Sequence, residues 1–277
     1  MFQLSLFGPN GDEPEEKPPY HATELRVLVT VKAAPNPSHK YGETVCVAGV
    51  RAEWNRPGWI RLYPINFRAL PPDKQFQKYD IIALQATPAT NDQRRESWCP
   101  NLETLRRVRH LNRWRERRAW LDPYVSDSMC AFNEAARQRQ DAPSLGLVTP
   151  RDISQLALAP HPGWTPDQQR KIDAYVRQGD LFHRPRKPLA PPRFRGTYHY
   201  RCHAPRCRGH RQTILDWEFV ALQHRHPGLS DSELRGVLEE KFFAILCDPA
   251  RDVAFYIGNQ AKRVQDFSVL GLYYPDR

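Results

Sequence analysis

Three side chains able to bind a metal stand close together near residue 205. Cys202, Cys207 and His210 form a Cys-x4-Cys-x2-His pattern. Tetrahedral zinc prefers thiolate and imidazole ligands, and a structural zinc site uses four of them. Cysteines in an arginine-rich turn also make poor core residues, although a buried-thiol role is the alternative. The pattern therefore predicts a zinc knuckle with a structural role, whose fourth ligand is His203, His199 or Cys247.

The other cysteines do not extend this pattern. Cys46 lies within an apolar strand-like run and is expected in the core. Cys99 and Cys130 have no candidate ligand close to them in the sequence, so we expect neither to take part in the metal site.

The same region is strongly basic. Residues 181–212 contain no acidic residue, and aromatic side chains alternate with the arginines. Basic side chains neutralise phosphates, and aromatic faces stack on unpaired bases. We expect nucleic acid to contact the following residues: Arg193, Arg195, Tyr198, Tyr200, Arg201, Arg206, Arg208 and Arg211. The alternative is a basic loop that acidic groups elsewhere in the fold screen.

A second basic stretch spans residues 103–118. Leu105, Val108, Leu111 and Trp114 recur at helical spacing, which predicts a helix. Few carboxylates balance its arginines, and uncompensated like charges destabilise a helix. We therefore expect phosphate contacts from Arg106, Arg107, Arg109, Arg113 and Arg117, the alternative being an ordinary solvated face.

Overall composition agrees with an anionic partner. The chain has 41 Lys and Arg against 31 Asp and Glu, a formal charge of +10. A large positive excess favours association with polyanions, here DNA. No segment approaches the roughly 18 apolar residues of a membrane helix, and the N-terminus lacks the features of a signal peptide. We expect a cytoplasmic protein without membrane partners or structural disulfides, and the sequence indicates no oligomeric state.

The N-terminus carries a short apolar peptide, Gln3-Leu4-Ser5-Leu6-Phe7, followed by a turn signal at residues 8–11 and an acidic, proline-rich stretch to residue 19. All five positions match the sliding-clamp-binding motif of bacterial polymerases and mismatch-repair proteins, which this peptide resembles. The resemblance implies that Gln3 hydrogen-bonds at one subsite of the clamp while Leu6 and Phe7 fill an apolar pocket. The alternative is that residues 2–7 form an edge strand of the first domain.

Four short segments rich in β-branched residues follow the tail. Residues 25–32, 43–50, 58–65 and 79–87 are expected strands, and their regular spacing predicts a small β-barrel or sandwich. Residues 46–50 with residues 58–61 resemble bacterial OB-like or PUA-like small barrels, which implies a nucleic-acid-binding barrel.

The remaining elements complete an α+β protein. Helices are expected at residues 126–140, 166–178, 214–224 and 230–246, strands at 252–258 and 267–274, and a loop with a short strand at 144–158. The predicted organisation is a flexible tail (1–19), a small β-barrel (20–100), a helical basic region (101–180), and a smaller α/β unit that carries the Cys/His segment (181–277).

No catalytic motif stands out. Asp216, Glu218, Asp248, Asp252 and Lys241 are the candidates for a nuclease site, but a helix would place Asp216 and Glu218 on different faces. The leading hypothesis is a DNA-binding accessory protein recruited to the clamp, in replication, repair or mobile-element processes. A metal-dependent nuclease or other DNA-processing enzyme is the second hypothesis, and an RNA-binding barrel protein is the third.

Overall fold

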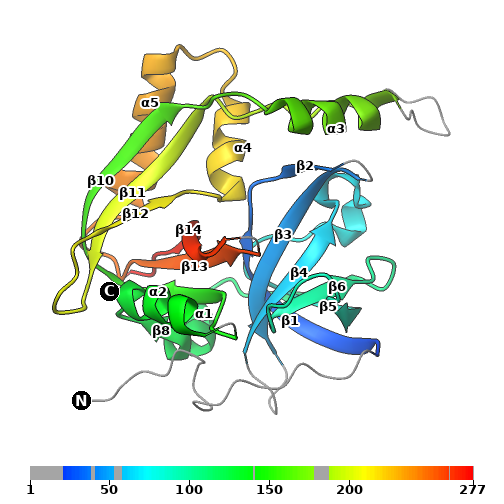
Figure 1. Ribbon diagram of the computed structural model, residues 1–277, viewed down its shortest axis with the longest axis horizontal. Coiled ribbons are helices and arrows are strands. Elements are labelled where there is room, and N and C mark those ends of the chain that lie inside the picture. Colours follow the sequence, from blue (N-terminus) through cyan, green and yellow to red (C-terminus); the bar gives the residue numbers. More distant parts are fainter. Residues whose placement is uncertain are drawn as a thin grey trace.

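The first half of the chain forms a closed β-barrel. The computed structural model describes residues 21–38, 41–52, 58–139, 141–177, 187–261 and 263–276, so the N-terminal pentapeptide lies outside the described residues. The barrel strands are β1 (Thr23–Lys32), β3 (Gly42–Arg51), β4 (Trp59–Ile65), β6 (Ser97–Pro100) and β5 (Asp80–Pro88), in that order. Pairing of β5 with β1 closes the barrel (Figure 1). The predicted small barrel is thus confirmed.

Short elements border the barrel. Strand β2 (Asn36–Ser38) pairs with β3, and the 3-10 helices η1 (Phe67–Ala69) and η2 (Pro72–Lys74) lie between β4 and β5. Strand β7 (Arg106–His110) pairs with the beginning of β5, while β6 pairs with its end.

The barrel strands are apolar on both faces. In β1, Val27 and Val29 point into the barrel, whereas Leu28 and Val31 point outwards into a second buried cluster. That second cluster includes Leu147, on a sheet of the C-terminal half. Strands covered on both sides read as continuous hydrophobic runs, which explains the apolar run Val27-Leu28-Val29 in β1.

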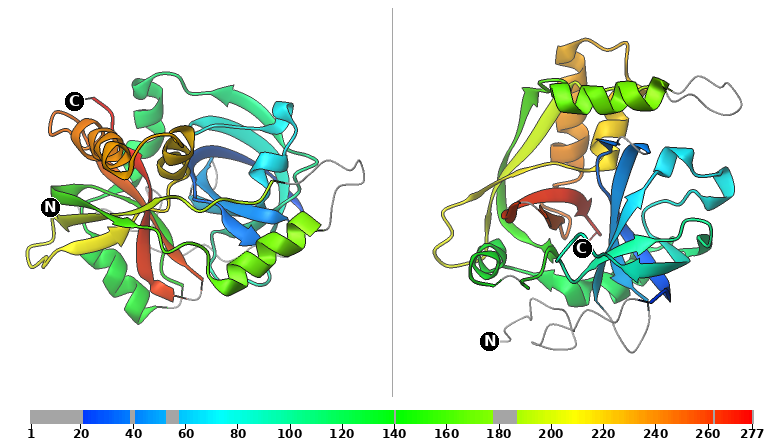
Figure 2. Two further views of the ribbon diagram at one scale, coloured as in Figure 1. Left: turned by 90° about the horizontal axis from the view of Figure 1, so that it is seen from above. Right: turned by 45° about the vertical axis from the view of Figure 1, so that its right-hand side comes forward.

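The C-terminal half contains two further sheets. The first has the order β14 (Arg263–Tyr273), β13 (Ala254–Gln260), β9 (Leu145–Val148), β8 (Val125–Ser126). The second has the order β10 (Pro150–Pro160), β11 (Phe194–Cys202), β12 (His210–Thr213). The helices are α1 (Trp114–Leu121), the 3-10 helix η3 (Asp122–Tyr124), α2 (Met129–Gln138), α3 (Pro166–Arg177), α4 (Trp217–Arg225) and α5 (Asp231–Glu239), and α5 continues as a π-helical turn, η4 (Glu240–Ile245). Figure 2 shows α4 and α5 on one side of the three-stranded sheet.

The predicted helical middle is not what the structure shows. Residues 106–110 form strand β7, and the helix begins only at Trp114. The strand forms because the free edge of β5 takes a partner there: His110 lies opposite Asp80, whose buried carboxylate it meets at 2.8 Å. The helical spacing predicted that Val108 would be buried, but its side chain is 42% exposed. Tertiary pairing has overridden the helical pattern.

Several local predictions are confirmed, and some strands were missed. Ser230 and Glu233 form the predicted capping box of α5. Helix α2 begins within the predicted range, where the Ser128 hydroxyl accepts a hydrogen bond from Ala131 N at 3.1 Å. The long pairing of β10 with β11 was not predicted from the sequence.

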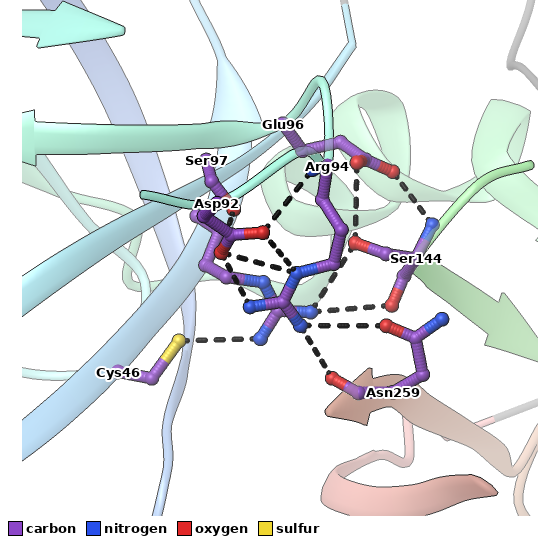
Figure 3. A network of polar contacts seen from close by, with 8 residues as sticks. Cys46, Asp92, Arg94, Glu96, Ser97, Ser144 and Asn259 are labelled. Atoms are coloured by element: carbon purple, nitrogen blue, oxygen red, sulfur yellow. Dashed lines mark hydrogen bonds and ion pairs between the residues drawn. The ribbon is translucent and has the colours of Figure 1, made fainter. Parts of the chain in front are cut away.

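A buried polar network joins the barrel to the C-terminal half (Figure 3). Arg61 on β4 donates to Cys46 Sγ at 3.3 Å and to the Ser144 carbonyl at 3.2 Å. Glu96 accepts hydrogen bonds from the backbone N–H and the hydroxyl of Ser144, at 2.7 and 3.1 Å. Arg94 donates to the Asn259 carbonyl at 2.7 Å. These contacts hold β4 and β6 against the ends of β9 and β13.

None of the described helices has both the length and the hydrophobicity that membrane crossing requires.

Candidate metal centre and basic face

Four potential ligands meet at the loop end of the β11–β12 hairpin. Cys202 ends β11, Cys207 lies in the hairpin loop, His210 begins β12, and Cys130 comes from α2. Their ligand atoms all lie within 4.8 Å of one another. The Cys202 and Cys130 sulfurs are 3.6 Å apart, and His210 Nε2 lies 3.2 Å from Cys207 Sγ, 3.3 Å from Cys202 Sγ and 3.6 Å from Cys130 Sγ.

These separations fit a tetrahedral metal site. Zinc–sulfur bonds of about 2.3 Å and zinc–nitrogen bonds of about 2.0–2.1 Å place two sulfurs about 3.8 Å apart and a sulfur and a nitrogen about 3.6 Å apart. The four separations given above come within about 0.4 Å of these values. The structure therefore contains a candidate metal site with three sulfur donors and one nitrogen donor.

The surrounding chain holds this arrangement in place. Gly209 adopts a φ of 103°, a left-handed conformation that suits glycine, and so turns the loop back into β12. The His203 N–H donates to the Asp127 carbonyl at 2.9 Å, which docks the hairpin beside the start of α2. Burial lowers the pKa of His210, which favours the neutral imidazole that coordinates metals.

The fourth ligand differs from the sequence prediction. His203 is exposed and lies outside the cluster, and Cys130 takes its place. His199 is likewise outside it, and Cys247 instead contacts the Phe242 carbonyl at 3.3 Å. Cys130 precedes Cys202 by 72 residues, so no local spacing rule could have paired them.

The solvent-facing side of the three-stranded sheet is basic. Side chains alternate along β11, where Phe194, Gly196, Tyr198, Tyr200 and Cys202 are buried and the intervening residues face outwards. We call this outward side the basic face, and it consists of Asp152, Gln155, Ala157 and Ala159 on β10, Arg195, Thr197, His199 and Arg201 on β11, and Arg211 and Thr213 on β12. Arg206 and Arg208 extend it into the hairpin loop.

The arginines of this surface have no acidic partners. In the described part of the chain, no ion pair or hydrogen bond engages the side chains of the five arginines Arg195, Arg201, Arg206, Arg208 and Arg211. Asp152 is the single acidic residue of the three strands. It stands opposite Arg201 in the strand register, but its carboxylate lies 3.3 Å from Arg151. Arg193 differs from the five, because it pairs with Asp231 and donates to the Leu229 carbonyl at 2.7 Å.

The structure corrects the role expected for two aromatic residues. Tyr198 and Tyr200 are 0% and 2% exposed, and both point away from the basic face. The Tyr200 hydroxyl donates to Gln212 at 2.6 Å, and the Tyr198 ring stacks on Phe255 at 4.8 Å between centroids. These tyrosines are core residues, so they cannot stack on bases in the folded chain.

The first basic stretch is partly neutralised by the fold. Arg106 pairs with Glu24 at 3.0 Å, and Arg107 pairs with the buried Asp80 at 3.1 Å. Arg117 donates to the Leu111 carbonyl at 2.8 Å and lies over the Tyr79 and Trp114 rings. The remaining members of the predicted contact set, Arg109 and Arg113, are exposed.

A second polar cluster lies where α4 meets the barrel. Asp216 is the N-cap of α4, and its carboxylate accepts the Glu218 N–H at 2.8 Å. Both residues line one cavity with Lys32 and Lys78. The sequence prediction placed Asp216 within the helix, but Asp216 precedes it, and the two carboxylates can therefore face the same cavity. Burial, reinforced by Glu218, raises the pKa of Asp216 to about 7. The cavity, about 10 Å³, has room for about one water molecule.

The other acidic candidates lie around a larger cleft. This cleft, of about 680 Å³, is bordered by the turn after η4 and by the end of α1, and it includes Asp248 and Asp252. In this cleft, Arg118 lies 3.0 Å from Asp252 and 3.2 Å from Asp122, so its positive charge balances part of the acidic charge there. Neither acidic cluster forms a group of potential metal ligands comparable to the cysteine–histidine cluster within the described residues.

Two family models divide the chain between residues 123 and 125. One, described as a domain of unknown function (DUF8758), matches residues 23–123, which comprise the barrel, β7 and α1. The other, described as a domain of unknown function (DUF8757), matches residues 125–277, which contain the cysteine–histidine cluster and the basic face. No curated protein matches the chain.

Proposed function

Because the chain belongs to the family described as Domain of unknown function (DUF8757), whose description names no activity, we propose a function from its own residues. The protein is a DNA-binding accessory factor that its N-terminal pentapeptide, Gln3 to Phe7, recruits to a bacterial sliding clamp. Replication, repair and mobile-element processes are the settings in which such a factor would act.

The observation that carries DNA binding is the set of arginines without acidic partners on the basic face. A protein normally balances clustered charge with its own carboxylates, as β7 does with Asp80 and Glu24. Three arginines on one side of the sheet and two in the adjoining hairpin loop, none of them in an ion pair among the described residues, favour an external polyanion.

We assign Zn²⁺ to the cluster of Cys130, Cys202, Cys207 and His210. Four protein ligands complete a tetrahedral shell and leave no open position for substrate, which supports a structural role. When bound, the ion would fasten the hairpin loop, with Arg206 and Arg208, to α2. Elemental analysis should find about one zinc per chain, and Cys202→Ser should lose it.

DNA binding is tested by removing charge from the basic face. The triple variant Arg195→Gln, Arg201→Gln, Arg211→Gln should lose most of its affinity for DNA in a fluorescence anisotropy titration. Arg225→Gln is the matched control, because Arg225 is exposed at the end of α4, which packs behind the same sheet. Equal affinities of the triple variant and the control would contradict the proposal.

Recruitment is tested separately. Replacing Gln3, Leu6 and Phe7 with Ala should abolish pull-down of the purified clamp while leaving DNA affinity unchanged. Pull-down that survives the substitutions would remove the clamp from the proposal and leave DNA binding untouched.

The enzyme alternative has one supporting observation, the approach of Asp216 and Glu218 to two lysines in a single cavity. It requires divalent-metal-dependent cleavage of single-stranded, duplex or branched DNA that Asp216→Ala or Glu218→Ala removes. The RNA alternative is addressed by competing RNA against DNA at fixed salt, where preferential displacement by RNA would favour it.

A further inference from the structure

Resting on the proposed function, we infer that the basic face recognises the phosphate backbone of duplex DNA, without reading bases and without preference for single strands. The inference depends on which side chains the sheet presents to solvent and which it buries.

The basic face lacks the Phe, Tyr and Trp rings on which unpaired bases usually stack. Preference for single strands usually requires exposed aromatic rings, each worth about 1–3 kcal/mol per stacked base. Among the described residues of β10, β11 and β12, the aromatic rings of Phe194, Tyr198 and Tyr200 are all buried. The outward positions of the three strands hold arginine, histidine, threonine, alanine, glutamine and one aspartate, Asp152. A nucleic acid lying here would meet cations and small polar groups, and the outward side chains of these strands include no Phe, Tyr or Trp ring on which a base could stack.

The spacing of the cations suits an extended charged backbone. Arg195 and Arg201 stand at opposite ends of β11, six residues apart, which corresponds to about 20 Å along a strand. That length covers about six base pairs of a duplex that rises about 3.4 Å per pair. Arg211 lies on the neighbouring strand, directly opposite His199, and widens the charged area between these ends.

The flat geometry also disfavours base readout. Sequence is read mainly by a helix or a ribbon inserted into the major groove, with side chains that reach base edges. Here the central strand, β11, is flanked by β10 on one side and by β12 on the other. The sheet therefore presents a broad surface to DNA, and β11 cannot insert into a groove. Threonine and alanine at the centre are also too short to reach beyond the phosphates. Contacts from arginine to phosphates set position and affinity and carry no sequence information directly.

The test compares three ligands for the full-length, zinc-loaded protein: two 20-base-pair duplexes of unrelated sequence and one 20-nucleotide single strand. We expect the duplexes to bind within about threefold of each other and at least about tenfold more tightly than the single strand. If all five arginines contact phosphates, the slope of log affinity against log salt for a duplex is about −4.5, which is about 500-fold weaker binding at 200 mM than at 50 mM salt.

The variant Arg201→Gln, Arg211→Gln should bring this slope about 1.8 closer to zero and weaken both duplexes equally, while Arg225→Gln should leave it unchanged. Thermal unfolding checks that both variants are folded. Tighter binding of the single strand, a strong preference for one duplex sequence, or an unchanged slope in the double variant would each overturn the inference. Failure to bind any nucleic acid would instead overturn the proposed function itself.

Discussion

Replacing Cys130 with serine tests the metal centre at the ligand that local spacing does not reveal. Cys130 is the one member of the cluster outside the hairpin, and it lies 72 residues before Cys202. Cys202 and His210 are separated by only 8 residues. A metal bound by all four residues therefore closes one long loop, between α2 and β11, and one short loop within the hairpin.

The loop lengths set the size of the effect. In the chain-entropy treatment of cross-links, closing a 72-residue loop stabilises the fold by about 4 kcal/mol, and closing an 8-residue loop by about 2.5 kcal/mol. Cys130→Ser releases the long loop even if the ion stays on the hairpin, so we expect a loss of about 4 kcal/mol. At about 2–4 °C per kcal/mol for a chain of this size class, the melting temperature should fall by about 8–16 °C.

Cys207→Ser is the informative comparison, because it also removes one thiolate but leaves Cys130, Cys202 and His210 to close both loops. It should therefore be destabilised less than Cys130→Ser. The assay is thermal and urea unfolding with and without a chelator, alongside zinc content, with the exposed Cys99→Ser as the control. Chelator should abolish the difference between the two variants. Equal stabilities of Cys130→Ser and Cys207→Ser in zinc, or a wild-type protein that the chelator does not destabilise, would refute this reasoning.

Three further predictions concern other parts of the fold. The raised pKa of Asp216, about 7 against an ordinary value of 3.8, means that the unfolded chain loses this proton before the folded chain does, so stability should fall from about pH 4 to pH 7 by up to about 4 kcal/mol. Asp216→Asn keeps an oxygen to cap α4 but cannot ionise, so urea unfolding across this range should show a shallower decline, and an identical pH profile would count against it. Gly196→Ala should cost about 1–3 kcal/mol in the same assay, because its Cβ would lie 2.8 Å from Ile214 Cδ1 and 2.9 Å from Phe219 Cζ, and a neutral result would mean that these side chains move aside. Ser230→Ala should cost about 1 kcal/mol through loss of the α5 cap, whereas Ser230→Asp should retain most of the stability, and equal losses in both would argue against the cap.

Local sequence signals predicted much of the fold. The barrel strands are recognisable because both of their faces are buried, so residues such as Val27 and Leu28 are apolar without interruption. The capping box at Ser230 marks the start of α5 for a similarly local reason. Strand β11 also carried a clear signal, an alternation of period two from Phe194 to Cys202, but its buried tyrosines were interpreted as a surface for stacking bases.

The features that the sequence did not reveal depend on partners far along the chain. Cys130 joins the metal cluster only because α2 packs beside the hairpin. The arginines of residues 106–118 were interpreted as unbalanced, but Asp80, on β5, and Glu24, on β1, neutralise two of them. Asp216 and Glu218 share a cavity because α4 begins between them. A sequence pattern does not locate the start of a helix to within one or two residues, so it could not reveal this arrangement.

The shared core between the barrel and the C-terminal half has a consequence for how the two segments could be inherited. The family boundary falls between residues 123 and 125, yet Leu28 and Ala48 before it pack in one cluster with Leu147 and Leu270 after it. A gene fragment encoding either segment alone would leave this apolar surface facing water, and the buried Arg61 would lose Ser144. The boundary separates the segments that two family models match, and recombination at that point would need a replacement partner with a matching apolar surface.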